Sequence, residues 1–512
     1  MWTFPTETPP QKVNGRLGSK KTKTGCLTCR KHRVKCDEQR PLCKRCRRLK
    51  LHCAGYQDLF RIFGISRQGS AYPASKPNRP AANPDRQLSI FPGSDEERRL
   101  FELFRTSVVF QLSGFLDEDF WITTLLQVSH LVSLVRDSAI AIAAHIAEHH
   151  RHFRTTTPQQ SRNISLKYYQ KALHRANWHT ESADKELVAV ICCPLFLCLE
   201  FLQGKKLQAM SLFARGHCLM KTFQERHARN FAVSGCAAIY DSLRPMYNRL
   251  TMMAKLFGHS LPVDYSDLAF LLGSNPTIYT VNTLKDARDC LFQHLVIAHE
   301  FVKRLNSTTC APLAMHKHHL HRQEELLSQL DVWNSNFNHI CGSLAVSVRA
   351  AVATLSMWHT AAVIWLRHPF EGFEMTFDES LDCFQIIVEK AKEALTTKQN
   401  VQDTFAFGMG VLPPLYFTSL KCRHFFLRKE ALRLMRQCPK MEGLWDRDEL
   451  ITVASHAFAL ETSAQSEITS LPAEHQRLIK VKILQGDAAR RLQSAFIFRE
   501  HKVEQAWNKI IQ

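Results

Sequence analysis

The stretch GCLTCRKHRVKCDEQRPLCKRCRRLKLHCAGY, residues 25–56, decides the fold of the first part of this 512-residue chain. Its six cysteines follow the spacing C-x2-C-x6-C-x6-C-x2-C-x6-C, which gives two similar halves. Two separate four-coordinate zinc sites would need more than six thiolates, so two ions must share two sulfurs. The spacing therefore predicts two Zn(II) ions held by Cys26, Cys29, Cys36, Cys43, Cys46 and Cys53.

An even set of cysteines also suits a disulfide framework in a short secreted domain. The opening residues MWTFPTETPPQKVN contain no apolar segment of a secretory signal. Eleven further cysteines are scattered along the chain, several inside apolar runs, as in proteins of a reducing compartment. They are Cys192, Cys193, Cys198, Cys218, Cys236, Cys290, Cys310, Cys341, Cys383, Cys422 and Cys438. We therefore favour metal ligation over disulfides.

Positive charge is concentrated in the same part of the chain. Residues 1–60 hold fifteen Lys and Arg against four Asp and Glu, and so contribute eleven of the formal net charge of +20. Two Zn(II) ions and six ionised thiolates lower this local excess to about +9. A small module with such an excess attracts a polyanion such as DNA, although a solvated face or an import signal has the same composition.

The residues between Cys29 and Cys36 are basic except for Val34. Such a segment has no apolar face to bury, so we expect a short helix that begins near Cys29 and packs on the metal. Structural zinc then supplies much of the folding free energy, on the order of 10 kcal/mol or more per site.

Residues 25–56 resemble the DNA-binding domain of the fungal zinc binuclear cluster (Zn2Cys6) transcription factors. The cysteine spacing, the basic run after Cys29, the KCDE at 35–38 and Pro41 in the connecting loop carry this resemblance. It implies that Cys26 and Cys43 are the bridging ligands, which the spacing alone does not reveal.

The resemblance also implies that His32 and Arg33 contact bases in the major groove. Members of the family usually carry two Lys or Arg there and often recognise CGG-like half-sites, so His32 departs from the pattern. An arginine fork reaches guanine O6 and N7 together, for about 1–3 kcal/mol of discrimination. We expect phosphate contacts from the surrounding basic residues Arg30, Lys31, Lys35, Lys44, Arg45, Arg47 and Arg48.

The composition changes after the cysteines. Residues 68–93 contain five prolines among Gly, Ser, Ala and Asn, which is typical of a linker. We therefore predict a basic arm at 1–20, a zinc domain at 21–56 and a linker at 57–93. Many family members follow the zinc domain with a coiled coil that sets dimer spacing, but 54–93 shows no heptad run. A homodimer would have to form without one.

From residue 94 to 512 the apolar pattern is helical and strand-like alternation is rare, which predicts a mostly α chain with a large all-α domain. Ser94 and Glu97 have the spacing of a capping box. The first helix face that it opens comprises Leu100, Phe101, Phe104 and Val108. A second stripe comprises Leu131, Leu134, Val135, Ser138 and Ile142, and a third, after Gly204 as in a helical hairpin, comprises Leu207, Met210, Phe213 and Ala214.

Residues 104–121 and 195–204 resemble the helical regulatory region that follows the linker in many of these factors. This second resemblance implies packed helical pairs used for regulation and partner contact.

Other chemistry finds little support in the sequence. The apolar run 187–199 contains Pro194 and is shorter than the roughly 20 residues of a bilayer span. We therefore expect a buried helix and no membrane contact.

Two groups of histidines lack the matched carboxylate of a metalloprotease motif, which argues against a functional metal site there. They are His145 and His149, and His316, His318, His319 and His321. There is no phosphate-binding loop or nucleophile elbow, so we expect no enzyme. Residues 443–450, GLWDRDEL, are expected to form an exposed helix start.

These observations predict a nuclear, sequence-specific regulator of RNA polymerase II transcription that binds double-stranded DNA and contacts transcription machinery or co-regulators. Family resemblance points to metabolic genes, including secondary-metabolite clusters, as targets. The alternative is a helical scaffold or small-molecule sensor held on nucleic acid by a non-specific basic zinc module.

Overall fold

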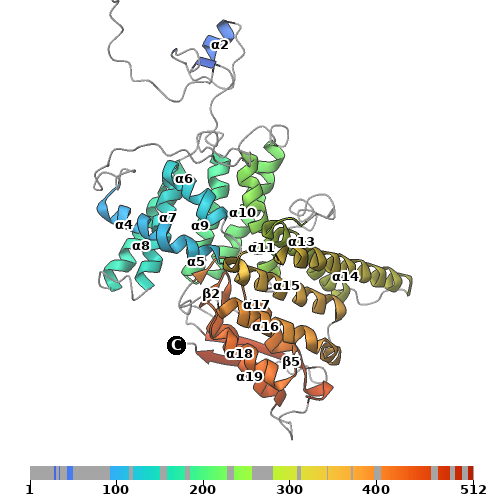
Figure 1. Ribbon diagram of the computed structural model, residues 1–512. Coiled ribbons are helices and arrows are strands. Elements are labelled where there is room, and N and C mark those ends of the chain that lie inside the picture. The colour runs from blue at the N-terminus through green and yellow to red at the C-terminus, as the bar shows by residue number, and fades with distance from the viewer. Residues whose placement is uncertain are drawn as a thin grey trace, which may run out of the picture. The chain divides into compact units, whose positions relative to one another are not determined.

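The computed structural model describes residues 28–29, 34, 43–49, 93–114, 119–149, 158–178, 185–227, 236–256, 281–307, 313–342, 344–370, 373–396, 405–462, 471–484, 491–498 and 505–510. The chain forms two compact units, a small one that contains the cysteine-rich segment and a large one that contains the helices from Asp95 onward. Helices dominate the large unit (Figure 1), which confirms the mostly α prediction.

The first half of the large unit is a series of packed helices. Helix α7 packs against α8 and α9, and α9 packs against α10. The elements are α4 (Asp95–Leu103), the π-helical turn η2 (Phe104–Val108), α5 (Val109–Ser113), the π-helical turn η3 (Asp119–Leu125), α6 (Leu126–Leu131), α7 (Ser133–His149), α8 (Pro158–Trp178), α9 (Lys185–Leu202), α10 (Lys206–His227) and α11 (Cys236–Leu256).

The second half continues in the same way. Helix α13 packs on α14 and α15, α15 on α16, and α17 on α18 (Figure 1). The helical elements are α13 (Leu284–Ser307), α14 (Leu313–Cys341), η5 (Val346–Val348), α15 (Arg349–Arg367), η6 (Glu374–Ser380), α16 (Leu381–Thr396), α17 (Leu412–Lys421), α18 (Phe425–Met435), α19 (Arg447–Thr462) and η7 (Glu474–Gln476).

The capping box at the start of α4 is confirmed. The Glu97 backbone N–H donates to Ser94 Oγ at 3.2 Å, and the Ser94 backbone N–H donates to Glu97 Oε2 at 2.9 Å. The face that follows is buried at Phe101, Phe104 and Val108. Local sequence therefore fixes where this helix begins and which side it buries.

Helices α9 and α10 form the expected hairpin. Helix α9 is buried and contains Pro194, and Gly204 turns the chain with a φ of 71°, a conformation that favours glycine. The predicted inner stripe of α10 is right for Met210 and Phe213 but wrong for Leu207, whose side chain is 60% exposed. Leu207 lies in the first turn of α10, where Lys205 and Gln208 beside it are exposed as well.

A small three-stranded sheet lies beside the start of α19. Its strands are β1 (Phe405–Ala406), β2 (Met441–Glu442) and β3 (Trp445–Asp446), with β1 parallel and β3 antiparallel to β2. The helix start predicted near 443–450 is present at Arg447, but its exposure is not. Leu444 and Trp445 are buried, so these apolar side chains belong to the core and not to an accessible surface.

A second sheet closes the described chain, and its presence is an addition to the predicted all-α domain. Strands β4 (Leu478–Leu484), β5 (Arg491–Phe498) and β6 (Gln505–Ile510) are antiparallel in the order β4-β5-β6. Phe496 and Leu478 pack against Val453 and Ala457 of α19. The sheet is thus held on a helix face by an apolar contact.

Buried charges join this sheet to the helices. Glu461 of α19 pairs with Arg423 at 3.0 Å and with Arg428 at 2.6 Å, and all three side chains are almost completely buried. Glu461 also accepts the backbone N–H of Leu478 at 2.7 Å, while Arg423 donates to the Leu478 carbonyl at 2.9 Å. One carboxylate therefore holds two guanidinium groups and the first residue of β4.

Among the described helices, none combines the length and the apolar character that a membrane span requires.

Candidate metal centre

Three of the six predicted ligands lie in the described part of the cysteine-rich segment. Cys29 is helical together with Thr28, and its carbonyl accepts the backbone N–H of Val34 at 3.0 Å. Cys43 is the N-cap of α2 (Lys44–Arg48), and Cys46 lies within that helix. The first half of the cysteine pattern thus supplies Cys29, and the second half supplies the other two.

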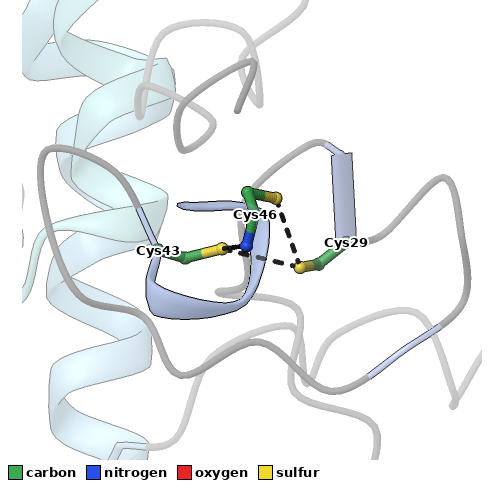
Figure 2. Close-up of side chains that lie close together, drawn as sticks. All are labelled: Cys29, Cys43 and Cys46. Carbon is green, nitrogen blue, oxygen red and sulfur yellow. Dashed lines mark hydrogen bonds between the residues drawn. The ribbon is translucent and has the colours of Figure 1, made fainter. Parts of the chain in front are cut away.

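The three sulfurs face one another, as Figure 2 shows. The Sγ atom of Cys29 lies 3.7 Å from Sγ of Cys43 and 3.9 Å from Sγ of Cys46. All three side chains are buried and none forms a disulfide. Within the described residues, this is the one group of three or more His, Cys, Asp or Glu side chains whose ligand atoms converge for a metal.

These distances fit zinc. Sulfurs about 2.3 Å from a tetrahedral Zn(II) ion lie about 3.8 Å from each other, which matches the 3.7 Å and 3.9 Å separations. A disulfide would bring two sulfurs to about 2.05 Å. The thiolate chemistry and the spacing of the three residues therefore both suit a zinc–thiolate centre.

Helix α2 also supplies hydrogen bonds to the sulfurs. The Cys46 backbone N–H donates to Cys43 Sγ at 3.2 Å, as expected for an N-cap acceptor. The guanidinium Nη1 of Arg45 donates to Cys29 Sγ at 3.8 Å. Both bonds direct an N–H group at a sulfur, as groups around metal ligands commonly do.

The basic residues of α2 fall into two groups. Lys44, Arg47 and Arg48 are exposed, whereas Arg45 is half-buried against the cysteines. Exposed cationic side chains of this kind suit contact with a polyanion. The role of Arg45 beside the metal ligands had no signal in the sequence, because the cysteine spacing does not tell which way an intervening side chain turns.

The remaining predicted site residues lie outside the described residues. They are the ligands Cys26, Cys36 and Cys53, the base contacts His32 and Arg33, and the phosphate contacts Arg30, Lys31 and Lys35. Their assignments stay predictions.

The histidine groups weighed in the sequence have other surroundings. His145 is hydrogen-bonded to the Leu202 carbonyl through Nε2 at 3.1 Å. His318 and His321 are exposed on α14, and His319 is half-buried beside the Phe301 ring. The side chains of His149 and His316 lie outside the described set.

Comparison with known proteins identifies the cysteine-rich segment. Residues 24–61 match the model of the fungal Zn(2)-Cys(6) binuclear cluster domain. A domain of this class binds two zinc ions, so the predicted cofactor is confirmed at the level of the domain. No solved structure matches the chain.

Known fungal regulators are similar to this chain over different lengths. The aspercryptin biosynthesis cluster-specific transcription regulator atnN of Emericella nidulans is 21% identical over 95% of each chain. White-opaque regulator 2 of Candida albicans is 55% identical over 47 residues, 9% of this chain and 10% of the relative. Arginine metabolism regulation protein II of Saccharomyces cerevisiae is 51% identical over 41 residues, 8% of this chain and 5% of the relative.

One relative aligns over nearly the whole chain at low identity, and the others align over 41–47 residues at higher identity; all three are named as regulators. Residues 24–61 of this chain therefore belong to the fungal Zn(2)-Cys(6) binuclear cluster domains, and the chain as a whole is similar to transcription regulators of fungi.

Proposed function

We propose that this chain is a nuclear, sequence-specific DNA-binding regulator of RNA polymerase II transcription and not an enzyme. The observation that carries the proposal is the convergence of three buried sulfurs from both halves of the cysteine pattern at separations of 3.7 Å and 3.9 Å. Exposed basic side chains border these sulfurs on α2. A zinc-folded module with a cationic surface suits DNA.

The metal ligands in this proposal are the six cysteines of the pattern, with Cys26 and Cys43 as the bridging pair. The bridging pair is assigned from the resemblance to the family, and the sulfur of Cys43 lies 3.7 Å from the first-half sulfur of Cys29. Sharing is needed because six thiolates must complete two tetrahedral sites.

Base reading is assigned to His32 and Arg33, with a CGG-like half-site as the expected target. Arg33 supplies the bidentate contact to guanine, and His32 offers ring nitrogens in place of a second cationic side chain. Phosphate contacts are assigned to Arg30, Lys31 and Lys35, and on α2 to Lys44, Arg47 and Arg48, whose exposure supports this role.

The helical part is proposed to control output. In this view residues 1–20 are a basic arm, 21–56 the zinc domain, 57–93 a linker and 94–512 the regulatory domain that contacts co-regulators or a second copy of the chain. The relative that aligns over 95% of both chains is named for the aspercryptin biosynthesis cluster. This similarity supports a secondary-metabolite gene cluster as the target of the present chain.

The test is selection from random duplex DNA with the full chain at stated salt, in parallel with Cys46→Ser and the matched control Cys218→Ser. Cys218 is an exposed cysteine of α10. We expect wild type and the control to enrich the same short motif and Cys46→Ser to enrich none. Binding without any enriched motif would favour the scaffold or sensor held on nucleic acid by a non-specific module.

A second measurement separates the two kinds of DNA contact. Arg33→Gln is expected to relax the preference at one base of the site, with a loss of about 1–3 kcal/mol of discrimination against the other bases. Arg47→Gln is expected to weaken all sequences alike and to reduce the slope of log K against log salt by about 0.9. The same loss of preference in both variants would contradict the assignment.

A further inference from the structure

Arg45 stands apart from the other basic residues of α2. It is half-buried, and its Nη1 atom donates to Cys29 Sγ at 3.8 Å. Lys44, Arg47 and Arg48 are exposed on the same helix. The Arg45 guanidinium is thus directed at a sulfur, whereas the other three basic side chains extend into solvent.

The contact also joins the two halves of the cysteine pattern. Arg45 lies between Cys43 and Cys46 in the second half, while the sulfur that it contacts belongs to the first half. The carbonyl of Arg45 accepts the backbone N–H of Leu49 at 3.0 Å, so the residue is fixed within the helical turn. The backbone of Arg45 is therefore fixed in α2, and its side chain reaches the sulfur of Cys29 in the first half of the cysteine pattern.

The chemistry of a thiolate cluster favours such a neighbour. Two Zn(II) ions with six thiolates carry two net negative charges. A guanidinium beside a sulfur offsets part of this charge and orients the ligand, as groups around metal ligands commonly do. Arginine suits the position better than lysine, because its planar fork is less strongly hydrated and offers several fixed N–H directions.

We propose that Arg45 is a positioning residue of the zinc centre, which holds Cys29 against the second half of the cluster and slows loss of zinc, and that it is not a phosphate contact. This inference rests on the proposed function, in which these cysteines hold zinc. It assigns support of a metal ligand to Arg45 and a phosphate contact to Arg47, although both arginines lie on the same short helix.

The test compares full-length wild type, Arg45→Gln, Arg45→Lys and the matched control Arg47→Gln. Bound zinc is measured directly, and its release is titrated with a chelator of known zinc affinity. We expect Arg45→Gln to bind zinc with an affinity about 10–100-fold weaker than that of wild type, which is the range typical of residues that support metal ligands. Arg45→Lys is expected to lie between the two, and Arg47→Gln to release zinc like wild type.

DNA binding at saturating zinc supplies the second readout. Arg47→Gln is expected to reduce the salt slope by about 0.9, while Arg45→Gln keeps the wild-type slope. Equal zinc release by Arg45→Gln and Arg47→Gln, or a reduced salt slope in Arg45→Gln, would overturn the inference and leave the zinc domain standing. Wild-type protein without bound zinc would instead overturn the proposed function, and the inference with it.

Discussion

Cysteines serve opposite purposes in the two units of this protein. In the small unit, Cys29, Cys43 and Cys46 are buried against one another with hydrogen-bond donors aimed at their sulfurs. In the helical unit, burial raises the pKa of Cys193 to about 11, although Tyr247 opposes the shift. A thiol that stays protonated among apolar side chains is a poor metal ligand.

The comparison teaches that the number of cysteines says little without their surroundings. Cys193 is buried, as are Cys29, Cys43 and Cys46, yet those three converge as metal ligands do, whereas Cys193 packs within the helical unit. In its described residues the small unit buries only Cys29, Cys43 and Cys46, and we expect it to depend on zinc, whereas the helical unit has apolar cores and buried charge networks. The two units should therefore fail under different treatments.

Removal of zinc is the largest expected effect. A chelator, or Cys43→Ser, is expected to unfold the cysteine-rich unit and abolish specific DNA binding, because each zinc site contributes on the order of 10 kcal/mol. Far-UV circular dichroism should change little, since the helices of the large unit hold no zinc ligand of the pattern. Zinc content and DNA binding check this result. Cys218→Ser is the control, and a Cys43→Ser protein that keeps both ions would contradict it.

Breaking the buried charge network should damage the other unit. Glu461→Ala leaves Arg423 and Arg428 without their shared carboxylate, which is expected to destabilise the helical unit by about 3–5 kcal/mol. Urea unfolding followed by circular dichroism measures the change. Zinc content should equal that of wild type. Loss of zinc along with helical stability would show that the two units are coupled more tightly than this comparison implies.

The capping box gives a smaller effect confined to one helix end. Ser94→Ala is expected to lower the free energy of unfolding by about 1 kcal/mol, because the Glu97 backbone N–H loses its acceptor. Thr283 and Asp286 exchange equivalent bonds before α13, so Thr283→Ala is a matched variant. Urea unfolding of both single variants and the double variant should give additive losses, and a strongly non-additive double variant would count against two local effects.

The smallest effect is a pH dependence at the surface of α18. A hydrogen bond from Arg433, aided by Lys392, lowers the pKa of Glu430 from 4.5 to about 2. Because the pKa is lower in the folded state, this carboxylate stabilises above pH 4.5 and the contribution is lost as the pH falls toward about 2. Glu430→Gln should cost under about 1 kcal/mol at pH 7. The difference from wild type in urea unfolding should shrink at pH 3, and a growing difference would contradict the assignment.

Parts of the helical unit were predictable from local sequence. The Ser94–Glu97 spacing located the start of α4, and Gly204 located the turn between α9 and α10, because caps and positive φ angles depend on a few neighbouring residues. Leu207 is exposed although it continues the apolar stripe, because helical periodicity does not reveal which residues of a stripe another element covers.

The closing sheet was predictable in part. Residues 479–483, Ile-Lys-Val-Lys-Ile, alternate as a strand does, and β4 spans them. That alternation is short within a long helical pattern, and it does not tell which strands pair. The pairing of β4 with β5, and the support from Glu461, depend on residues that are distant in sequence.

Residue order is sufficient to predict the zinc ligands, the cationic character of the first 60 residues and the helical class of the rest, because ligand spacing, charge and periodicity can be read along the chain. The contact of Arg45 with Cys29, the exposure of Arg47 and the burial of Trp445 become visible only in the folded chain. Side-chain direction and burial depend on which distant segments meet. Such contacts arise from the packing of the whole fold and leave no local signature.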